Sequence, residues 1–296
     1  MLSAVRPAAA SASRTVVQQA HQQANMATLK EIQMRLKSIT NIGKITKSMK
    51  MIASTKMARA QRGMDVARAN GAATSALVKN IGVQATTDNP NVFVAVSSDR
   101  GLCGGVHSAI TKNIKRTIKA SNTGDAALVI LGDKCRNQLA REYREAIKLT
   151  YSQLGKTVPS FLEASIIADE ILAIKDLPAN PKINVVYNKF LSVIAYEPTH
   201  MHTISYADLK AAPKLATYEM EGDILANLHQ FMFATSLHWA MNEGHAAEFA
   251  ARRSAMDNAT KNAGEMVDRL TLLYNRQRQA SITNDLVDII TGASAL

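Results

Sequence analysis

The sequence predicts an α/β fold in which two long terminal helices, paired along their length, flank a central domain of alternating strands and helices. None of the seven prolines falls within residues 27–82 or 223–291, so each of these segments is free to form one uninterrupted helix. Between them, short apolar runs alternate with helical patterns, which is typical of a parallel sheet. We therefore predict four segments, namely residues 1–26, 27–82, 90–212 and 220–296.

Residues 1–26 have the composition of an organellar transit segment. They contain Arg6, Arg14 and several Ser and Ala residues, and the first acidic residue of the chain is Glu31. A disordered cytosolic tail is the alternative. We expect the mature chain to begin between Ala24 and Ala27, where this composition ends.

The N-terminal helix is predicted to begin at a capping box, in which the side chains of Thr28 and Glu31 each bond a backbone N–H of the other residue. Apolar and small residues then recur at spacings of three and four, which indicates a helix packed lengthwise on a partner. This expected seam is Leu29, Ile32, Leu36, Ile39, Gly43, Thr46, Lys50, Ala53, Met57, Ala60, Met64 and Ala67. In its weak middle part, the apolar residues Ile42, Ile45, Met49 and Ile52 lie one position over.

Charge separates the two predicted helices. Residues 26–80 carry eleven Lys and Arg against two acidic residues, whereas residues 223–291 carry six against eight, within a chain of formal net charge +11. Opposite signs favour pairing, although exposed ion pairs contribute only about 0–1 kcal/mol each. The excess cations between Lys44 and Arg62 form either a solvated face or a strip that awaits an acidic partner, and the residues alone leave both open.

The central segment is expected to hold a small parallel sheet with an antiparallel hairpin at its edge. A strand at Asn91–Val96 leads into a Gly-rich turn and a helix containing Ile110, Ile114 and Ile118. The remaining expected elements are strands at Ala126–Leu131, Lys148–Ser152, Ile183–Phe190 and Ala195–Ile204, and helices at 134–145 and Phe161–Lys175.

The C-terminal helix is expected to start at an N-cap supplied by Asp223 and to run for roughly 100 Å. Its predicted seam is Met256, Ala259, Ala263, Met266, Leu270, Leu273, Gln277 and Ala280. Beyond the seam the chain becomes apolar at Ile282, Leu286, Ile289, Ile290 and Ala293. Periodicity alone favours a coiled-coil spacer with an apolar end; the alternative is a shaft whose apolar tip turns inside a partner.

No catalytic, cofactor-binding or metal-binding residue is predicted. The Gly-rich turn Ser97–Gly105 lacks the Lys-Ser/Thr of a P-loop and does not fit G-x-G-x-x-G. The spacing of Cys103 and Cys135 matches neither a CxxC pair nor a zinc site, and the seven histidines are scattered. We therefore expect no enzyme that works by itself.

Four motifs resemble the γ subunits of F-type ATP synthases. Residues 36–53 are similar to the N-terminal helix of that family, and 98–105 to its first loop. Residues 253–263 resemble its C-terminal helix, and 278–283, with Gly292-Ala293 beyond, resemble its terminal signature. Asp285 departs from the Glu that is usual there. The regulatory cysteine insertion of chloroplast relatives is absent, which favours a mitochondrial protein.

The resemblance implies a rotor shaft: a long antiparallel, left-handed coiled coil of the N- and C-terminal helices with a central Rossmann-like α/β domain. Its tip would lie in a ring of α and β subunits, and its central domain would touch the proteolipid c-ring and the small central-stalk subunits δ and ε. The protein would be peripheral to the mitochondrial inner membrane, on the matrix side. Proton flow would turn the shaft, and ATP would be made on β.

In that setting the resemblance assigns partner contacts to seven residues. Met49 and Lys50 would face acidic loops of β, and Arg278 and Gln279 would meet another β loop, with Thr283 in the same signature. Ile289 and Ile290 would run in a hydrophobic sleeve.

Two other classes of function remain. A basic coiled coil that binds nucleic acid would account for the charge and would show steeply salt-dependent affinity. A soluble nucleotide-binding enzyme would account for the α/β core and would bind ATP alone.

Overall fold

The computed structural model describes residues 8–83, 92–121, 126–175, 177, 181–219 and 224–295. The chain divides into two compact units. The central unit is Met49–Met256, and the terminal unit combines the chain up to Ser48 with the chain from Asp257 onward.

Two long helices, α1 (Ala8–Ile81) and α6 (Leu225–Ser294), contribute to both units. α1 starts at Ala8, so the prediction that a helix begins at Thr28 with a capping box is wrong. The residues before Thr28 are rich in Ala and Gln, which favour helix, and no proline interrupts them after Pro7. Asp223, the expected N-cap of α6, lies outside the described residues; at this end the N–H of Leu228 donates to the carbonyl of Ile224 at 2.9 Å.

The central unit contains a five-stranded sheet of order β3-β2-β1-β4-β5. Strands β1 (Val92–Val96), β2 (Ala127–Leu131), β3 (Ile147–Tyr151) and β4 (Ile183–Phe190) are parallel, and β5 (Tyr196–His202) runs antiparallel to β4. The predicted parallel sheet with an edge hairpin is confirmed.

Five shorter helical segments complete the central unit: three lie between strands, and two lie between β5 and α6. They are α2 (Val106–Ser121), α3 (Asp133–Leu139), α4 (Phe161–Leu172), α5 (Tyr206–Lys210) and the 3₁₀ turn η1 (Leu215–Thr217). α3 is shorter than the predicted helix 134–145, because the chain must turn after Leu139 to bring the Ala146 carbonyl to the Leu128 N–H. α4 also ends before the predicted Lys175, and it begins at a capping box between Ser160 and Glu163 that sequence reasoning missed.

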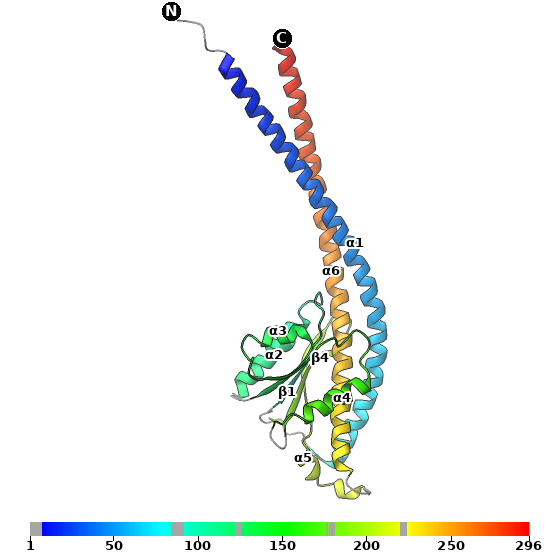
Figure 1. Ribbon diagram of the computed structural model, residues 1–296. Helices are drawn as coiled ribbons and strands as arrows, with labels where there is room; N and C mark the ends of the chain where they lie inside the picture. The colour runs from blue at the N-terminus through cyan, green and yellow to red at the C-terminus, as the bar shows by residue number, and fades with distance from the viewer. Residues whose placement is uncertain are drawn as a thin grey trace, which may run out of the picture. The chain divides into compact units, whose positions relative to one another are not determined.

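Helices cover both faces of the sheet (Figure 1). On one face α2 and α3 bury Ile110, Ile114 and Leu139 against strand residues such as Phe93 and Leu128. On the other face lie α4 and the first half of α6, which contribute Ile167, Ile171, Phe233, Leu237 and Met241. α6 is therefore part of the domain core as well as one member of the helix pair.

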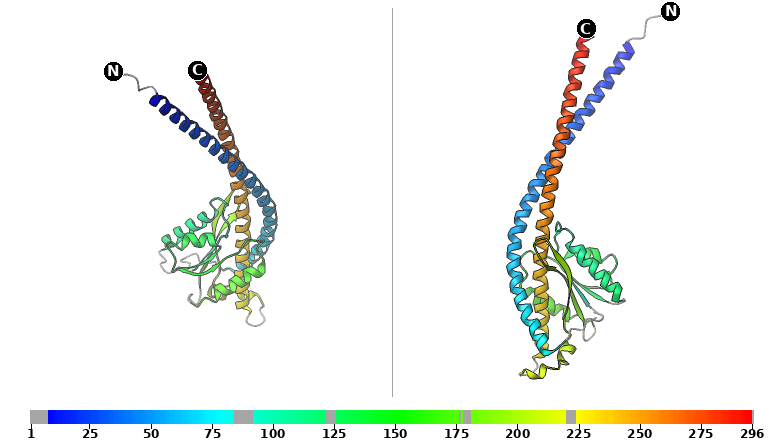
Figure 2. Two further views of the ribbon diagram at one scale, coloured as in Figure 1. Left: turned by 45° about the horizontal axis from the view of Figure 1, so that its top comes forward. Right: turned by 180° about the vertical axis from the view of Figure 1, so that it is seen from behind.

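Within the central unit, α1 packs on α6 mostly through alanines, and the two helices lie side by side in both views of Figure 2. The contact joins Ala53, Met57, Ala60 and Met64 of α1 to Ala246, Ala247, Phe249 and Ala250 of α6. The pair is antiparallel, since Gly63 lies near Asn242 whereas Gly71, further along α1, lies near Trp239. Because Gly and Ala fill the interface, the two backbones can approach closely.

The predicted seam of α1 is confirmed. Its members from Leu29 to Ala67 are buried or half-buried, whereas Ile42, Ile45, Met49 and Ile52 are exposed. In the terminal unit a Cβ built at Gly43 would lie 3.5 Å from the Ala263 Cβ, and the Thr260 hydroxyl donates to the Thr46 hydroxyl at 2.9 Å.

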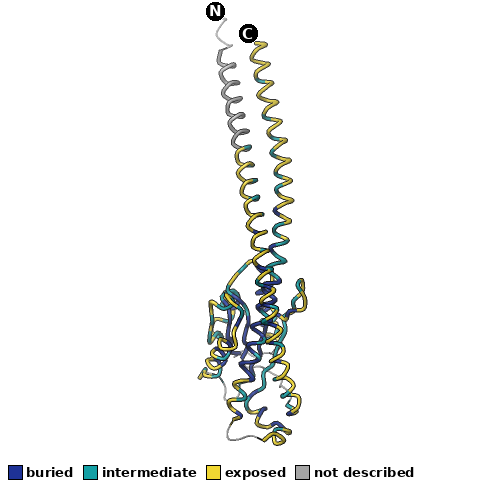
Figure 3. Tube along the Cα trace, turned by 90° about the vertical axis from the view of Figure 1, so that its right-hand side faces the viewer, coloured by how far each residue is buried: buried dark blue, intermediate teal, exposed yellow. Residues whose placement is uncertain are grey.

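The predicted seam of α6 is half right. Met256, Ala263, Leu270 and Gln277 face inward as expected, and Ala259 is half-buried. Met266, Leu273 and Ala280 are exposed, and the half-buried positions are instead Val267, Tyr274 and Ser281. The prediction took the first residue of each adjacent pair, although the second residue continues the helical spacing from Met256 equally well. These second residues are Thr260, Val267, Tyr274 and Ser281. Figure 3 shows this part of α6 as mostly exposed, in contrast to its buried stretch in the central unit.

Candidate partner-binding surfaces

Met49 lies at the edge of a groove in the central unit. Its side chain is 39% exposed, while Lys50 beside it is half-buried and its carbonyl accepts a hydrogen bond from the Ser54 hydroxyl at 2.9 Å. The groove has a volume of about 380 Å³ and is lined by Met49, Ile52, Ala53, Lys56, Arg100, Gly101, Leu102, Phe249, Arg252 and Met256. It therefore joins α1, α6 and the Gly-rich loop.

The groove combines an apolar lining with cations. The Lys56 ammonium lies 5.7 Å from the centre of the Phe249 ring, and the Arg252 guanidinium carbon lies 5.0 Å from it. Both cations are thus held against an aromatic face, an arrangement that is favourable by about 0.5–1 kcal/mol at exposed sites. With Arg100, the groove is suited to a partner that carries apolar and acidic side chains together.

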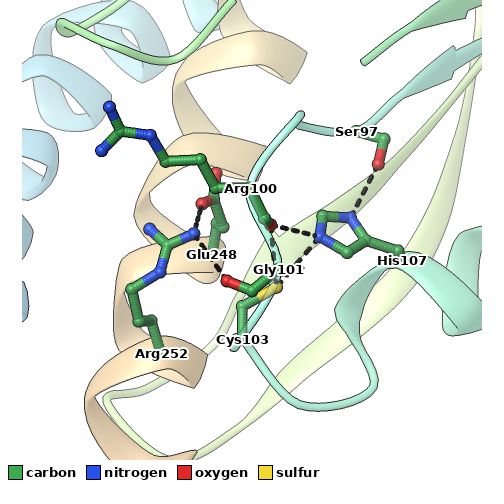
Figure 4. A network of polar contacts seen from close by, with 7 residues as sticks. All are labelled: Ser97, Arg100, Gly101, Cys103, His107, Glu248 and Arg252. Atoms are coloured by element: carbon green, nitrogen blue, oxygen red, sulfur yellow. Dashed lines mark hydrogen bonds and ion pairs between the residues drawn. The ribbon is translucent and has the colours of Figure 1, made fainter. Parts of the chain in front are cut away.

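The Gly-rich loop is fixed from two sides (Figure 4). On the inner side the Ser97 hydroxyl bonds Nδ1 of His107 at 2.8 Å, and Nε2 of His107 donates to the Arg100 carbonyl at 3.0 Å. On the other side Arg252 of α6, which is ion-paired with Glu248, donates to the Gly101 carbonyl at 3.4 Å. The loop is consequently held in one conformation by Ser97 directly after β1, by His107 of α2 and by α6.

Cys103 lies within this network but is not set up as a nucleophile. Its thiol is 3.0 Å from Nε2 of His107 and is buried. Burial, followed by the Glu248 carboxylate, raises the thiol pKa to about 11, and burial lowers the pKa of His107. Both groups are therefore neutral near pH 7, and the neutral thiol is a weak nucleophile.

Leu102 shows that the loop is built to present a side chain. Its φ is 65°, in the left-handed region that a branched residue rarely adopts, and its side chain is 63% exposed. Such backbone strain costs on the order of 1–3 kcal/mol and persists only where neighbouring contacts enforce it. Here those contacts are the bonds to Arg100 and Gly101, so the loop holds an apolar side chain out at the groove.

The crevice where α/β sheets commonly bind ligands is filled by the protein itself. That crevice lies beyond the carboxyl ends of β1 and β4, where the strand order reverses. There a Cβ built on Gly244 of α6 would lie 3.5 Å from Val96, and Phe190 at the end of β4 packs among residues of α1 and α6. Beside it, at the carboxyl ends of β1 and β2, His245 and Glu248 line a cavity of about 20 Å³. This is room for about one water molecule, not for a nucleotide.

Burial of His245 makes the stability of the folded chain depend on pH. Burial, with Arg252 and Lys56 nearby, lowers its pKa from 6.5 to about 4. Between pH 6.5 and 4, His245 is protonated in the unfolded chain but stays neutral in the folded chain. We therefore expect the free energy of unfolding to decrease as the pH falls over this range. The full effect is about 3 kcal/mol. Urea unfolding followed by the fluorescence of Trp239, the single tryptophan, should show a shallower loss over this range in His245→Gln; an identical pH slope in the two proteins would contradict the assignment.

The other predicted contact residues lie on α6 in the terminal unit. Arg278, Gln279, Thr283, Ile289 and Ile290 are all exposed, the two isoleucines by 70% and 58%. The Thr283 hydroxyl donates to the Gln279 carbonyl at 2.9 Å. Gln277, Ser281 and Asp288 are half-buried. Helical spacing places Gln279, Thr283, Ile289 and Ile290, together with Ile282 and Leu286, on the side of α6 away from these three residues, and it places Arg278 at the flank of that side.

The structure thus places the seven predicted residues on two units: Met49 and Lys50 on the central one, and the other five at exposed positions of α6 in the terminal one. Of the other groove residues, sequence reasoning placed Lys56 in the basic strip and Arg100 and Leu102 in the Gly-rich loop, and it missed Phe249 and Arg252. The basic strip and the Gly-rich loop were each recognised, but only the tertiary fold joins them.

Metal-binding clusters and membrane-spanning helices can be assessed for the described residues. Among them, no three His, Cys, Asp or Glu side chains are grouped as a metal site would require. None of the helices in this part of the chain is long and apolar enough to cross a membrane.

Comparison with known proteins gives a consistent result. A family model described as ATP synthase matches residues 28–296. The mitochondrial ATP synthase subunit gamma of Yarrowia lipolytica is 45% identical over 297 residues, covering 99% of this chain and 98% of that protein. The corresponding subunit of Rattus norvegicus is 38% identical, covering 91% of this chain and all of that protein.

Solved structures agree at the level of the fold. A chain of the Euglena gracilis mitochondrial ATP synthase (OSCP/F1/c-ring) aligns with a TM-score of 0.76 at 18% identity, covering 91% of this chain and 94% of that one. A chain of the central stalk and c-ring structure from Tetrahymena thermophila aligns with a TM-score of 0.61 at 24% identity, covering 73% and 99%.

Proposed function

This chain belongs to the γ-subunit family of mitochondrial ATP synthases, and we propose that its exposed helix and its groove are the surfaces through which it works as the enzyme's rotor shaft. Proton-driven rotation of a membrane ring turns the shaft, and the shaft drives the catalytic sites of the surrounding β subunits through their states. The coupling is allosteric, because the shaft stabilises one state of a distant site over another. The comparisons give no support to the nucleic-acid-binding alternative.

The observation that carries this proposal is the outward face of α6. Ile282, Leu286, Ile289 and Ile290 are each at least 55% exposed in succession. A helix end that is only a spacer would place polar side chains there, because exposed apolar stripes favour association. The stripe fits a hydrophobic sleeve formed by α and β subunits, in which an apolar surface can turn without breaking hydrogen bonds.

The groove supplies the second contact. Lys56, Arg100 and Arg252 surround apolar side chains, including the strained Leu102. An acidic loop of β that carries leucines would match both features, and Met49 and Lys50 lie along its path. The rest of the central domain then meets the proteolipid ring and the subunits δ and ε, on the matrix side of the inner membrane.

Rotation is tested by tethering α6. A cysteine at Ile282, which is 55% exposed, is paired with a cysteine on a facing β subunit in the assembled enzyme. We expect ATP hydrolysis to stop when the disulfide forms and to return on reduction. Full hydrolysis with the disulfide intact would show that this part of α6 does not need to turn.

Arg278 is expected to hold one β subunit transiently. A guanidinium can form charge-assisted bonds worth about 1.5–3 kcal/mol, strong enough to select a state and weak enough to release. Arg278→Ala should leave the helix folded, because alanine favours helix, and should reduce coupled ATP synthesis about tenfold.

Two variants sharpen this measurement. Arg278→Lys should recover part of the activity, since it restores the charge without the bidentate geometry. Arg276→Ala is the matched control, because Arg276 is an exposed arginine two residues away on the same helix. Normal coupled synthesis in Arg278→Ala, or an equal loss in Arg276→Ala, would show that Arg278 has no special role.

A further inference from the structure

Helix α4 carries apolar side chains on its solvent-exposed face. Its inner face buries Ala164, Ile167, Ala168 and Ile171 on the sheet. On the opposite side Leu162 and Ile166, one turn apart, are 68% and 51% exposed. A helix covering a domain normally has polar residues at that position, so the outer face of α4 has the composition of a second packing surface.

This surface continues onto α6. The ring of Phe161 at the start of α4 lies 5.7 Å from that of Phe231 on α6, and the two side chains are 39% and 54% exposed. Phe161 also meets the edge of His238 at 5.8 Å. Leu162, Ile166, Phe161 and Phe231 therefore form a patch across two helices of the central unit, which we call the α4 patch; exposed apolar clusters of this kind mark interaction sites.

The charge around the α4 patch is the reverse of the chain's average. α4 contains Glu163, Asp169 and Glu170, all exposed, and no Lys or Arg, in a chain of net charge +11. Two of the three carboxylates are fixed in place. Glu163 accepts the Ser160 N–H in the capping box, and Glu170 accepts the Tyr151 hydroxyl at 2.6 Å.

We propose that the α4 patch is the docking site of a basic amphipathic helix from another subunit of the central stalk. The choice of a stalk subunit as the partner rests on the proposed rotor function. Such a helix has apolar residues spaced by three and four, which pack between Leu162, Ile166 and Phe231, and flanking Lys or Arg residues, which meet the carboxylates of α4. The carboxylates disfavour an anionic membrane and a second copy of the same patch. The basic groove around Phe249 has the opposite charge, so the two surfaces select different partners.

The first test uses the full chain and a labelled 18-residue Leu/Lys peptide with apolar residues at helical spacing. We expect the double variant Leu162→Gln/Ile166→Gln to bind at least tenfold more weakly, and Asp169→Lys to weaken binding several-fold at low salt. Ile194→Gln is the matched control and should bind like the unmodified chain, because Ile194 is 86% exposed on the β4–β5 hairpin. Equal affinity in the double variant, or equal binding of a Leu/Glu peptide to the patch, would overturn the proposal.

The second test uses the assembled enzyme with a benzophenone side chain at Leu162. We expect a cross-link to a Lys/Arg-flanked amphipathic helix of a stalk subunit. The same label at Lys119, on α2 across the sheet, should not give that product. A product with lipid, with an acidic segment or with a second copy, or no product at all, contradicts the docking site. Assembly and ATP synthesis by the labelled enzyme report separately on the rotor function.

Discussion

Gly71→Ala is expected to destabilise the protein by about 2–3 kcal/mol, although alanine is the better helix former. A Cβ at this position of α1 would lie 2.3 Å from Cε3 and 2.8 Å from Cδ2 of Trp239, far inside contact distance. The ring cannot move aside as a flexible side chain would, so the two helices must separate, and overpacking of this kind costs about 1–3 kcal/mol or more. The melting temperature followed by circular dichroism should fall by about 5 °C or more.

Gly264→Ala is the matched control. Gly264 is also inside a long helix, but nothing lies within 4 Å of a Cβ built there. The same substitution should therefore raise stability by about 0.5–1 kcal/mol, the difference in helix propensity between the two residues. Opposite signs at the two glycines would identify close packing as the cause; destabilisation at both would point to a backbone effect instead.

Arg68→Ala is expected to lower the free energy of unfolding by about 3–5 kcal/mol at pH 7. Arg68 of α1 forms a 2.5 Å ion pair with Glu243 of α6, whose side chain is fully buried, and also donates to the Phe190 carbonyl at 2.8 Å. Removing the arginine leaves a buried carboxylate without its counter-charge, which is the costly way to break such a pair. Urea unfolding at pH 7 measures the loss.

Two further variants serve as controls for Arg68→Ala. Arg62→Ala, at an exposed arginine of α1, should change stability by no more than about 0.5 kcal/mol. The double variant Arg68→Leu/Glu243→Leu should regain most of the loss, because replacing both partners by apolar groups removes the unpaired charge. If Arg68→Ala were as mild as Arg62→Ala, the pair would not be a significant link between the helices.

The sheet was predictable because its signals are local. Each buried strand is a short β-branched run bounded by Gly or polar residues, and the five strands lie within one or two residues of the expected ranges. The seam of α1 was equally accessible, since Ala and Met recur at helical spacing. Long-range order is what sequence reading could not supply: Arg252 bonds the Gly101 carbonyl although the two residues are 151 positions apart, and no local pattern joins them.

The errors in the two long helices have a shared origin. Both predictions chose a boundary or stripe by residue type, at Thr28 because it caps well and at Leu273 because it is apolar. Helix α1 instead continues through residues that favour helix, and α6 turns Tyr274 inward beside Leu273. Local preference is a weak guide where a long helix is already stabilised over its length.

The packing of α6 against one face of the sheet has a consequence for how the chain is made. The sheet face that receives Phe233, Leu237 and Met241 is complete in sequence at His202, yet its cover is synthesised only afterwards. The Ala53–Met64 face of α1 stays uncovered longer still, because it packs against residues 246–250. During synthesis, therefore, an apolar helix face and one face of the sheet are exposed to solvent at the same time. Such exposed surface is prone to aggregate, so the nascent protein depends on protection until its last quarter emerges.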